Sequence, residues 1–119
     1  MTFGALAWAI ARAEGYPVSG SRPQRNRNPG DLRAWPGVPR DKDGFSIFPS
    51  DEAGFRALIT DLRNHARAYP DQTLAQFVGG DGAWPGYAPA SDGNDPEAYA
   101  ANLARWLGCQ TSFRMGELS

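Results

Sequence analysis

The chain is 119 residues long, with 41% apolar and 21% charged residues, a composition typical of a globular domain and not of a disordered chain. Its formal net charge of −1 argues against strong non-specific attraction to nucleic acid or to an anionic membrane. The single cysteine, Cys109, excludes an intrachain disulfide, and the length predicts one domain over residues 1–119.

The N-terminal segment does not have the pattern of a signal peptide. Residues 1–15 are apolar but lack a basic start, and Arg12 and Glu14 stand where a small-residue cleavage site would be. No stretch is long enough to cross a bilayer. We therefore expect synthesis in the cytoplasm without a signal peptide, no membrane insertion, and delivery by another route to any substrate outside the cytoplasm.

The first half of the chain predicts one helix, a loop and a hairpin. Apolar residues spaced by three and four predict a helix over residues 3–14. Residues 15–31 have no period and are rich in Gly, Pro, Ser, Asn and Arg, which indicates a loop. Leu32–Trp35 and Phe45–Phe48 are candidate strands of a short hairpin, with an Asp-Lys-Asp-Gly turn between them.

The second half predicts three more helices. The first covers about residues 50–68 and begins with a serine cap and two acidic residues, which suit the positive end of the helix dipole. A short helix over residues 73–78 precedes a second long loop. Asp95 is expected to cap the last helix, residues 96–107, which starts with proline. Residues 109–119 are expected to form a loose tail.

Glu14 is the main candidate for a catalytic residue. It shares a helix face with the apolar residues at positions 3, 7 and 10, so it should lie at the edge of the core. Partial desolvation and the negative end of the helix dipole would both raise the pKa of its carboxyl group. The general acid of a glycosidase needs such a retained proton. The alternative is a surface glutamate at a helix end, paired with Arg12 or another arginine.

Four motifs follow one another along residues 5–108: AIARAEG, RNRNPGDLR, FSIFPSDEAGFRAL, and YAP followed by DPEAYAANLARWLG. In this order they resemble the lysozyme-like peptidoglycan glycosidases, in particular small phage or prophage muramidases, lytic transglycosylases and N-acetylglucosaminidases. The resemblance implies a mainly α-helical, lysozyme-like (α+β) domain with a short β-hairpin beside the cleft.

The resemblance also implies roles for individual residues. In such enzymes a helix ends on the catalytic glutamate, a role that carries to Glu14. An Asn-Asn-Pro-Gly-Asn-Leu pattern lines the cleft, and here Arg27 and Asp31 replace two of the usual amides. The tyrosine of the Tyr-Ala-Pro motif would face the reacting sugar. The loop tryptophan at position 84 could stack on a sugar or fold onto the core. With it and an arginine from the basic loop, the expected substrate contacts are Asn26, Asn28, Arg33, Phe45, Phe48, Trp84 and Tyr87.

The expected chemistry leaves the second catalytic group open. An oxocarbenium-like transition state needs a second carboxylate or help from the substrate. Asp31, Asp43 and Asp51 are possible partners. Asp31 is nearest to the motif, but it could instead cap the hairpin or pair with Arg33. Tyr87 could stabilise the positive charge that develops in the transition state, or it could only pack in its loop. The resembling transglycosylases use one glutamate, which protonates the glycosidic oxygen and then takes a proton from the C6 hydroxyl of the sugar, whereas lysozymes deliver water.

Half of the basic residues fall between positions 22 and 42. They could hold carboxylates of peptidoglycan or phosphates of wall polymers, form a nucleic-acid patch, or make a solvated loop with a few ion pairs. No metal site or cofactor is expected, because the aspartates at positions 41–43 and 92–95 are too few for a calcium loop and should form turns and caps.

The sequence thus predicts a monomer that cleaves peptidoglycan glycan strands at the bacterial cell wall, with Glu14 as general acid and base and without a nucleic-acid partner. A phage lysis enzyme, a virion-carried enzyme and a secreted effector all fit. The alternative is a non-catalytic cell-wall-binding or phage structural module on the same scaffold. A more distant alternative is a phage protein that binds nucleic acid through the arginine-rich loop.

Overall fold

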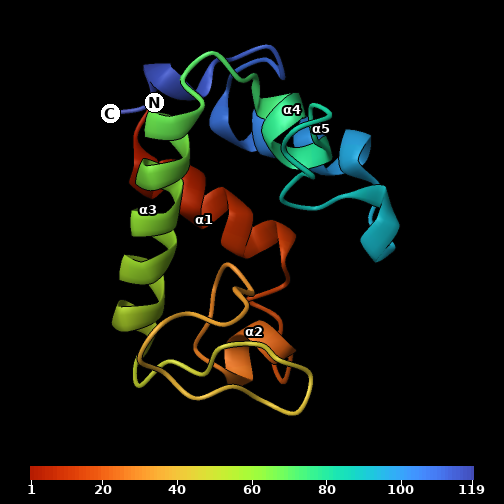
Figure 1. The fold of residues 1–119 in the computed structure, drawn as a ribbon. Coiled ribbons are helices and arrows are strands. Elements are labelled where there is room, and N and C mark those ends of the chain that lie inside the picture. The colour runs from red at the N-terminus through yellow and green to blue at the C-terminus, as the bar shows by residue number, and fades with distance from the viewer. The chain divides into compact units, whose positions relative to one another are not determined.

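The computed structural model describes all 119 residues, of which 48% are helical and only 5% lie in strands or isolated bridges. The chain divides into two compact units: an N-terminal unit, Phe3–Arg63, and a C-terminal unit, Met1–Thr2 with Asn64–Ser119. None of the helices has both the length and the apolar character needed to cross a bilayer. In chain order the helices are α1 (Phe3–Ala13), α2 (Arg22–Arg25), α3 (Asp51–Ala68), α4 (Leu74–Gly79), η1 (Ala90–Asp92), α5 (Pro96–Leu107) and η2 (Met115–Glu117), as Figure 1 shows.

The predicted lysozyme-like (α+β) fold with a β-hairpin is wrong, because no sheet forms. Residues 31–48 contain two isolated antiparallel bridges and no continuous ladder. Asp31 and Ala34 turn the backbone with φ of 50° and 54°, whereas a strand needs negative φ. Pro36 and Pro39 have no N–H to donate to a ladder. The segment is therefore an irregular loop whose two halves are joined by two isolated β-bridges.

Helix α1 forms as its apolar spacing predicts. Its buried residues include Leu6, Ala7 and Ile10. It ends at Ala13, one residue before the expected end, although the N–H of Glu14 still donates to the carbonyl of Ile10 at 2.8 Å.

Helix α2 was not predicted, although its start carries a signal. The hydroxyl of Ser21 accepts a hydrogen bond from the N–H of Gln24, and Pro23 lies in the first turn. Serine followed shortly by proline is a helix-start pattern. Four residues are too few to show a helical period, so the pattern of this segment indicates a loop.

Helix α3 begins as expected and touches the preceding loop through a glycine. The hydroxyl of Ser50 accepts from the N–H of Ala53 at 3.1 Å. Gly54 is buried, and a Cβ atom there would lie 2.1 Å from the carbonyl oxygen of Arg27 and 2.8 Å from Cδ of Pro29. The backbone of the helix and the loop therefore approach more closely than any side chain would allow.

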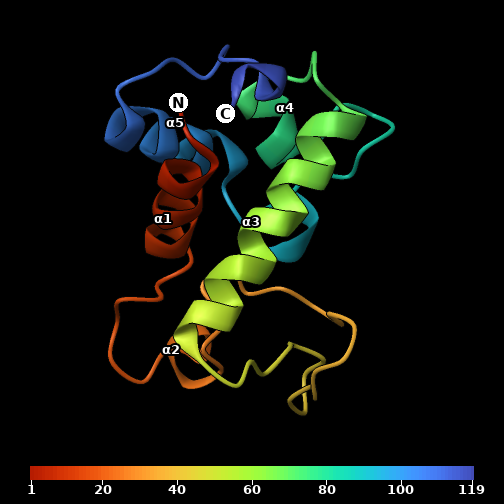
Figure 2. The same ribbon diagram turned by 90° about the vertical axis from the view of Figure 1, so that its left-hand side faces the viewer.

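In the C-terminal unit, α4 and α5 lie side by side (Figures 1 and 2). Thr73 and Gln76 form a capping box at the start of α4. Asp95 caps α5 by accepting from the N–H of Ala98 at 3.1 Å, and Gly108 ends it in the left-handed conformation, so the predicted limits of this helix are confirmed. The largest side chains buried in this unit are Leu74, Phe77, Val78, Leu103 and Met115.

The C-terminal residues 109–119 do not form the loose tail that the sequence suggested. The N–H of Leu74 donates to the carbonyl of Phe113 at 2.8 Å, and that of Ala75 donates to Thr111 at 3.0 Å. Met115 is fully buried. The tail is therefore part of the packing of the C-terminal unit.

Candidate functional site

Glu14 directly follows α1 in the N-terminal unit. The residue is half-buried, and its N–H makes the last α-helical hydrogen bond of α1. Gly15 then reverses the chain with φ of 81°. Glu14 thus combines partial burial with a position at the negative end of a helix dipole, as a candidate general acid should.

Asn28, an expected substrate contact, is an internal support of the loop. Its side-chain amide donates to the carbonyls of Leu32 at 2.9 Å and Ser46 at 3.0 Å, and its Oδ1 accepts from the N–H of Leu32 at 2.9 Å. The side chain is fully buried. In this structure Asn28 therefore sets the shape of the loop and has no surface to offer a ligand.

Asn26 supports the next turn in a similar way. It is buried, and its Nδ2 donates to Oδ2 of Asp41 at 2.8 Å. Oδ1 of Asp41 accepts from the N–H groups of Asp43 and Phe45. These bonds, that of Asn26 above all, lower the pKa of Asp41. The aspartates at positions 41 and 43 thus form the turn that the sequence predicted.

Asp31, the expected second carboxylate, is held by Arg22. Its Oδ2 lies 2.6 Å from one terminal nitrogen of the guanidinium, and its Oδ1 accepts from Nε at 3.1 Å. The sequence suggested Arg33 as the partner, because the helix that carries Arg22 was not predicted. The hydrogen bond with Asp31 raises the pKa of Arg22. With both oxygens bound to a cation, Asp31 is poorly placed to act as a nucleophile or base.

Phe45 and Phe48 are both buried, and each has a different surrounding. The guanidinium carbons of Arg22 and Arg33 lie 3.5 Å and 4.1 Å from the centroid of the Phe45 ring. Arginine stacking therefore occupies the ring of Phe45, and it is not open to a sugar.

Phe48 lines an open pocket of about 270 Å³ in the N-terminal unit. Its walls are mostly aromatic and aliphatic, with polar groups from Arg56 and Thr60. This pocket is in the same unit as Glu14. It also contains Trp35, which the sequence predicted as the last residue of a hairpin strand. Its lining residues are Trp35, Pro36, Val38, Phe48, Pro49, Ala53, Arg56, Ala57 and Thr60.

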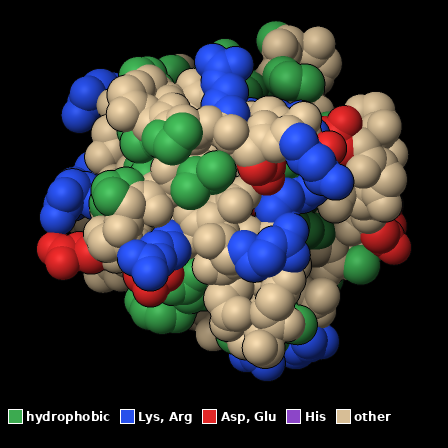
Figure 3. Space-filling view, turned by 90° about the horizontal axis from the view of Figure 1, so that it is seen from below, with side chains coloured by type: hydrophobic (Ala, Val, Ile, Leu, Met, Phe, Trp, Pro, Cys, Tyr) green, Lys and Arg blue, Asp and Glu red, His purple; other side chains and the backbone are tan.

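The loops around α2 form a basic face. Residues 15–50 carry six Lys and Arg against three Asp, although the whole chain has a net charge of −1. Figure 3 views the molecule from the side of α2 and shows Lys and Arg side chains spread over this face, with Asp and Glu side chains among them. The exposed members are Arg25, Arg27, Arg33, Arg40 and Lys42. Such a face favours an anionic ligand.

Trp84 and Tyr87 lie in the C-terminal unit, where both pack against Phe77. The indole Nε1 of Trp84 donates to the carbonyl of Phe77 at 2.8 Å, and its ring lies 4.5 Å from that of His65. The ring centroid of Tyr87 is 5.2 Å from that of Phe77. Trp84 is thus the loop tryptophan folded onto the core that the sequence left as an alternative to sugar stacking.

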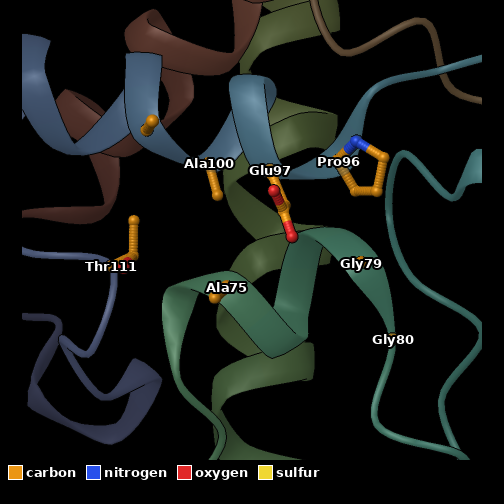
Figure 4. A pocket seen from close by; sticks show the side chains of 8 residues that line it. Ala75, Gly79, Gly80, Pro96, Glu97, Ala100 and Thr111 are labelled. Atoms are coloured by element: carbon orange, nitrogen blue, oxygen red, sulfur yellow. The ribbon is translucent and has the colours of Figure 1, made fainter.

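A second pocket, of about 380 Å³, lies in the C-terminal unit between α4 and α5. Figure 4 shows the Glu97 side chain extending from α5 toward α4. The other walls are mainly small residues without aromatic rings, and the full lining is Ala75, Gly79, Gly80, Pro96, Glu97, Ala100, Ala101 and Thr111. No sequence pattern indicates this pocket, because its walls come from α4, α5 and the C-terminal segment, which are separated along the chain.

An aromatic cluster of Trp8, Tyr16 and Phe55 in the N-terminal unit was also missed. The signal was present in α1, because Trp8 falls outside the stripe of Leu6, Ala7 and Ile10. A tryptophan outside the buried face of its helix must be exposed or covered by another segment.

No group of three or more His, Cys, Asp or Glu side chains is placed to hold a metal ion. Comparisons of the chain with protein-family models, with curated proteins and with solved structures found no match. The resemblance to peptidoglycan glycosidases therefore rests on the motifs of this chain alone.

Proposed function

We propose that this protein cleaves the glycan strand of bacterial peptidoglycan, with Glu14 as general acid and base. The observation that carries the proposal is the setting of Glu14, which is half-buried directly after α1. The order of the four sequence motifs supports the same residue. The site of action would be the cell wall, reached after release or delivery from the cytoplasm.

The proposed reaction uses the carboxyl group of Glu14 twice. The protonated carboxyl first donates its proton to the glycosidic oxygen, and the bond from that oxygen to the anomeric carbon breaks with oxocarbenium character. The resulting carboxylate then removes a proton from the incoming nucleophile. That nucleophile is water in a hydrolase, and in a transglycosylase it is the C6 hydroxyl of the same sugar, which gives a 1,6-anhydro product.

The pairing of Asp31 with Arg22 favours the route that needs one carboxyl group. A nucleophilic or basic Asp31 would have to leave the guanidinium, which binds both of its oxygens. Help from the substrate removes that requirement, because the C6 hydroxyl is already attached to the reacting sugar. We therefore favour transglycosylase-type cleavage by Glu14 alone.

The basic face of residues 15–50 suits this substrate. Peptidoglycan carries the carboxylates of its lactyl groups and peptide stems, and arginine binds carboxylates through two parallel hydrogen bonds. The exposed Arg25 and Arg40 would draw the strand to this face.

A non-catalytic wall-binding module is the second candidate. It is favoured by the burial of four expected substrate contacts, Asn26, Asn28, Phe45 and Phe48. A module of this kind would keep the basic face and bind the wall without cutting it.

The test is digestion of purified peptidoglycan by the wild-type protein, Glu14→Gln and Asp31→Asn, with the fragments read by mass spectrometry. Glu52→Gln is the matched control, because it makes the same chemical change on an exposed side chain of α3. We expect Glu14→Gln to lower the rate by roughly 10²–10⁴-fold. Asp31→Asn and Glu52→Gln should both stay active, and the products should carry anhydro ends.

Three outcomes would change the proposal. Equal activity of the wild type and Glu14→Gln would show that Glu14 is not the catalytic group. Reducing ends in place of anhydro ends would identify a hydrolase. The absence of fragments from every variant, together with co-sedimentation of the protein with peptidoglycan, would establish the binding module.

A further inference from the structure

The aromatic cluster of Trp8, Tyr16 and Phe55 joins α1, the turn after it and α3 within the N-terminal unit. The ring centroids of Trp8 and Phe55 are 4.4 Å apart, and that of Tyr16 lies 5.4 Å from Phe55 and 6.4 Å from Trp8. Trp8 is 59% exposed, whereas the other two are half-buried. The cluster is therefore a tryptophan held on the surface by two supporting rings.

Charged and polar groups border the cluster. The hydroxyl of Tyr16 donates to Oδ1 of Asp51 at 2.7 Å. The pKa of Tyr16 is raised to about 12. Partial burial is the largest cause, and the hydrogen bond to Asp51 and the negative charge of Asp51 add to it. The positive charge of Arg27 lowers the pKa in part. Arg27 lies close to the cluster, because its carbonyl oxygen touches α3 at Gly54, the residue before Phe55. Its guanidinium donates to the carbonyl of Pro49 at 3.0 Å. Asp51 and Arg27 are both exposed.

This combination matches the chemistry of a pyranose. A pyranose has an apolar face of C–H groups, which packs on an aromatic ring, and an edge of hydroxyl groups that both donate and accept hydrogen bonds. Asp51 can accept from such hydroxyls, and Arg27 can donate to them. Trp8 has few rotatable bonds and rests on Phe55, so holding its ring against a ligand costs little conformational entropy.

We propose that Trp8, Tyr16 and Phe55 form a sugar-stacking platform, where a pyranose of the glycan strand packs on Trp8 and its hydroxyls reach Asp51 and Arg27. The nature of the sugar rests on the proposed function, because peptidoglycan supplies the N-acetylated pyranoses. The platform binds and positions the strand, and it takes no part in bond cleavage.

The test uses the N-acetylglucosamine tetramer chitotetraose as the probe and the Glu14→Gln protein as the receptor, so that the probe stays intact. The four tryptophans give four indole N–H signals in NMR, which a Trp8→Phe variant assigns. We expect the Trp8 signal to shift on titration. In the same background Trp8→Ala should weaken binding about tenfold, and Trp8→Phe should weaken it less because a ring remains.

Val18→Ala is the matched control, because Val18 is 61% exposed and apolar but contributes no ring. It should bind chitotetraose as its parent does. Circular dichroism of each variant would show that its helices are intact. The shift of the Trp8 signal is measured in a protein whose platform residues are not substituted, so it does not depend on how well the Trp8 variants fold.

The proposal is overturned if the probe does not bind, or if it binds with equal strength to Trp8→Ala and leaves the Trp8 signal in place. It is also overturned if Trp8→Ala converts a dimer into a monomer, because the surface would then join two copies of the chain. Failure of the proposed function looks different: peptidoglycan stays uncut by the wild type, while chitotetraose still shifts the Trp8 signal.

Discussion

The loop region of the N-terminal unit and the helix pair of the C-terminal unit are stabilised in different ways. In residues 15–50, the buried amide of Asn28 binds backbone carbonyls and that of Asn26 binds Asp41. The carboxylate of Asp31 pairs with Arg22. In α4 and α5, buried apolar side chains such as Phe77 and Leu103 fill the space between helices. Hydrogen bonds depend on the direction of donor and acceptor, whereas apolar packing depends on side-chain volume. The helix pair should therefore be most sensitive to loss of volume, and the loop region to loss of hydrogen-bonding groups at constant volume.

The largest effect is expected from removing volume in the C-terminal unit. Phe77 is almost fully buried and contacts the rings of Trp84 and Tyr87. Phe77→Ala should lower the free energy of unfolding by about 4 kcal/mol, through lost burial and the cavity that remains. Urea unfolding would measure it, with Phe77→Leu as a control that keeps most of the volume. A loss below about 1 kcal/mol would show that volume does not govern this region.

The next effect comes from removing hydrogen bonds at constant volume in the loop. Asn28→Leu keeps nearly the same size but removes the amide donor to the carbonyls of Leu32 and Ser46 and the acceptor of the Leu32 N–H. The Leu32 carbonyl keeps its bond from the N–H of Ser46. We expect a loss of about 3 kcal/mol in unfolding free energy. Asn64→Leu, on the exposed surface of α3, is the matched control and should change stability by less than about 0.5 kcal/mol. If the two variants are equally stable, the polar support of the loop is unimportant.

Gly54→Ala tests the contact between α3 and the loop, because two effects of opposite sign compete there. Alanine in place of glycine would stabilise a helix interior by about 1 kcal/mol. The new Cβ would instead lie 2.1 Å from the carbonyl oxygen of Arg27, so backbone must move. We expect a net loss of about 2 kcal/mol by thermal unfolding. A stabilised variant would mean that the backbone of the loop moves away from Gly54 at little cost in free energy.

The smallest effect is a difference in pH response between Asp41 in the loop and Asp81 in the C-terminal unit. Both carboxyl groups have pKa values below the ordinary 3.8, Asp41 mainly through Asn26 and Asp81 mainly through the N–H of Trp84. A carboxyl with a lowered folded pKa adds stability at pH above about 4, and this is lost as the pH falls through the folded pKa.

Asn26→Ala should therefore raise the pKa of Asp41 toward 3.8 and leave that of Asp81 unchanged. Titration of the carboxyl carbons by NMR would follow both groups in one sample. An equal shift at both would show that the substitution loosens the whole chain and does not act through a local bond.

Helix α5 was predictable because each of its limits is set by neighbours in the sequence. Asp95 and Pro96 begin it, and Gly108 ends it. The hairpin prediction failed for the opposite reason, since Leu32–Trp35 and Phe45–Phe48 have strand-like composition but their pairing depends on the backbone between them. That backbone follows contacts between residues farther apart in the chain, such as Asn26 with Asp41 and Asn28 with Ser46, which no local pattern reveals.

Some features of the candidate site were predictable from the sequence and others were not, for the same reasons. The place of Glu14 at the end of α1 followed from the helical period, which is a local property. The motif RNRNPGDLR does not indicate whether the amide of Asn28 points outward to a ligand or inward to the loop. Trp8 was overlooked because its exposure follows from which residues cover α1, which is a tertiary property.

The hydrogen bonding of residues 15–50 has a consequence for dynamics. Leu32, Ser46 and Phe48 lie in no helix or sheet, yet the N–H of each donates a hydrogen bond. The acceptors are the side chain of Asn28 and the backbone carbonyls of Leu32 and Asn26, in that order. Amide protons held in this way should exchange slowly with deuterated water. Irregular backbone is thus not the same as mobile backbone: a protease or a deuterium pulse should find this stretch closed.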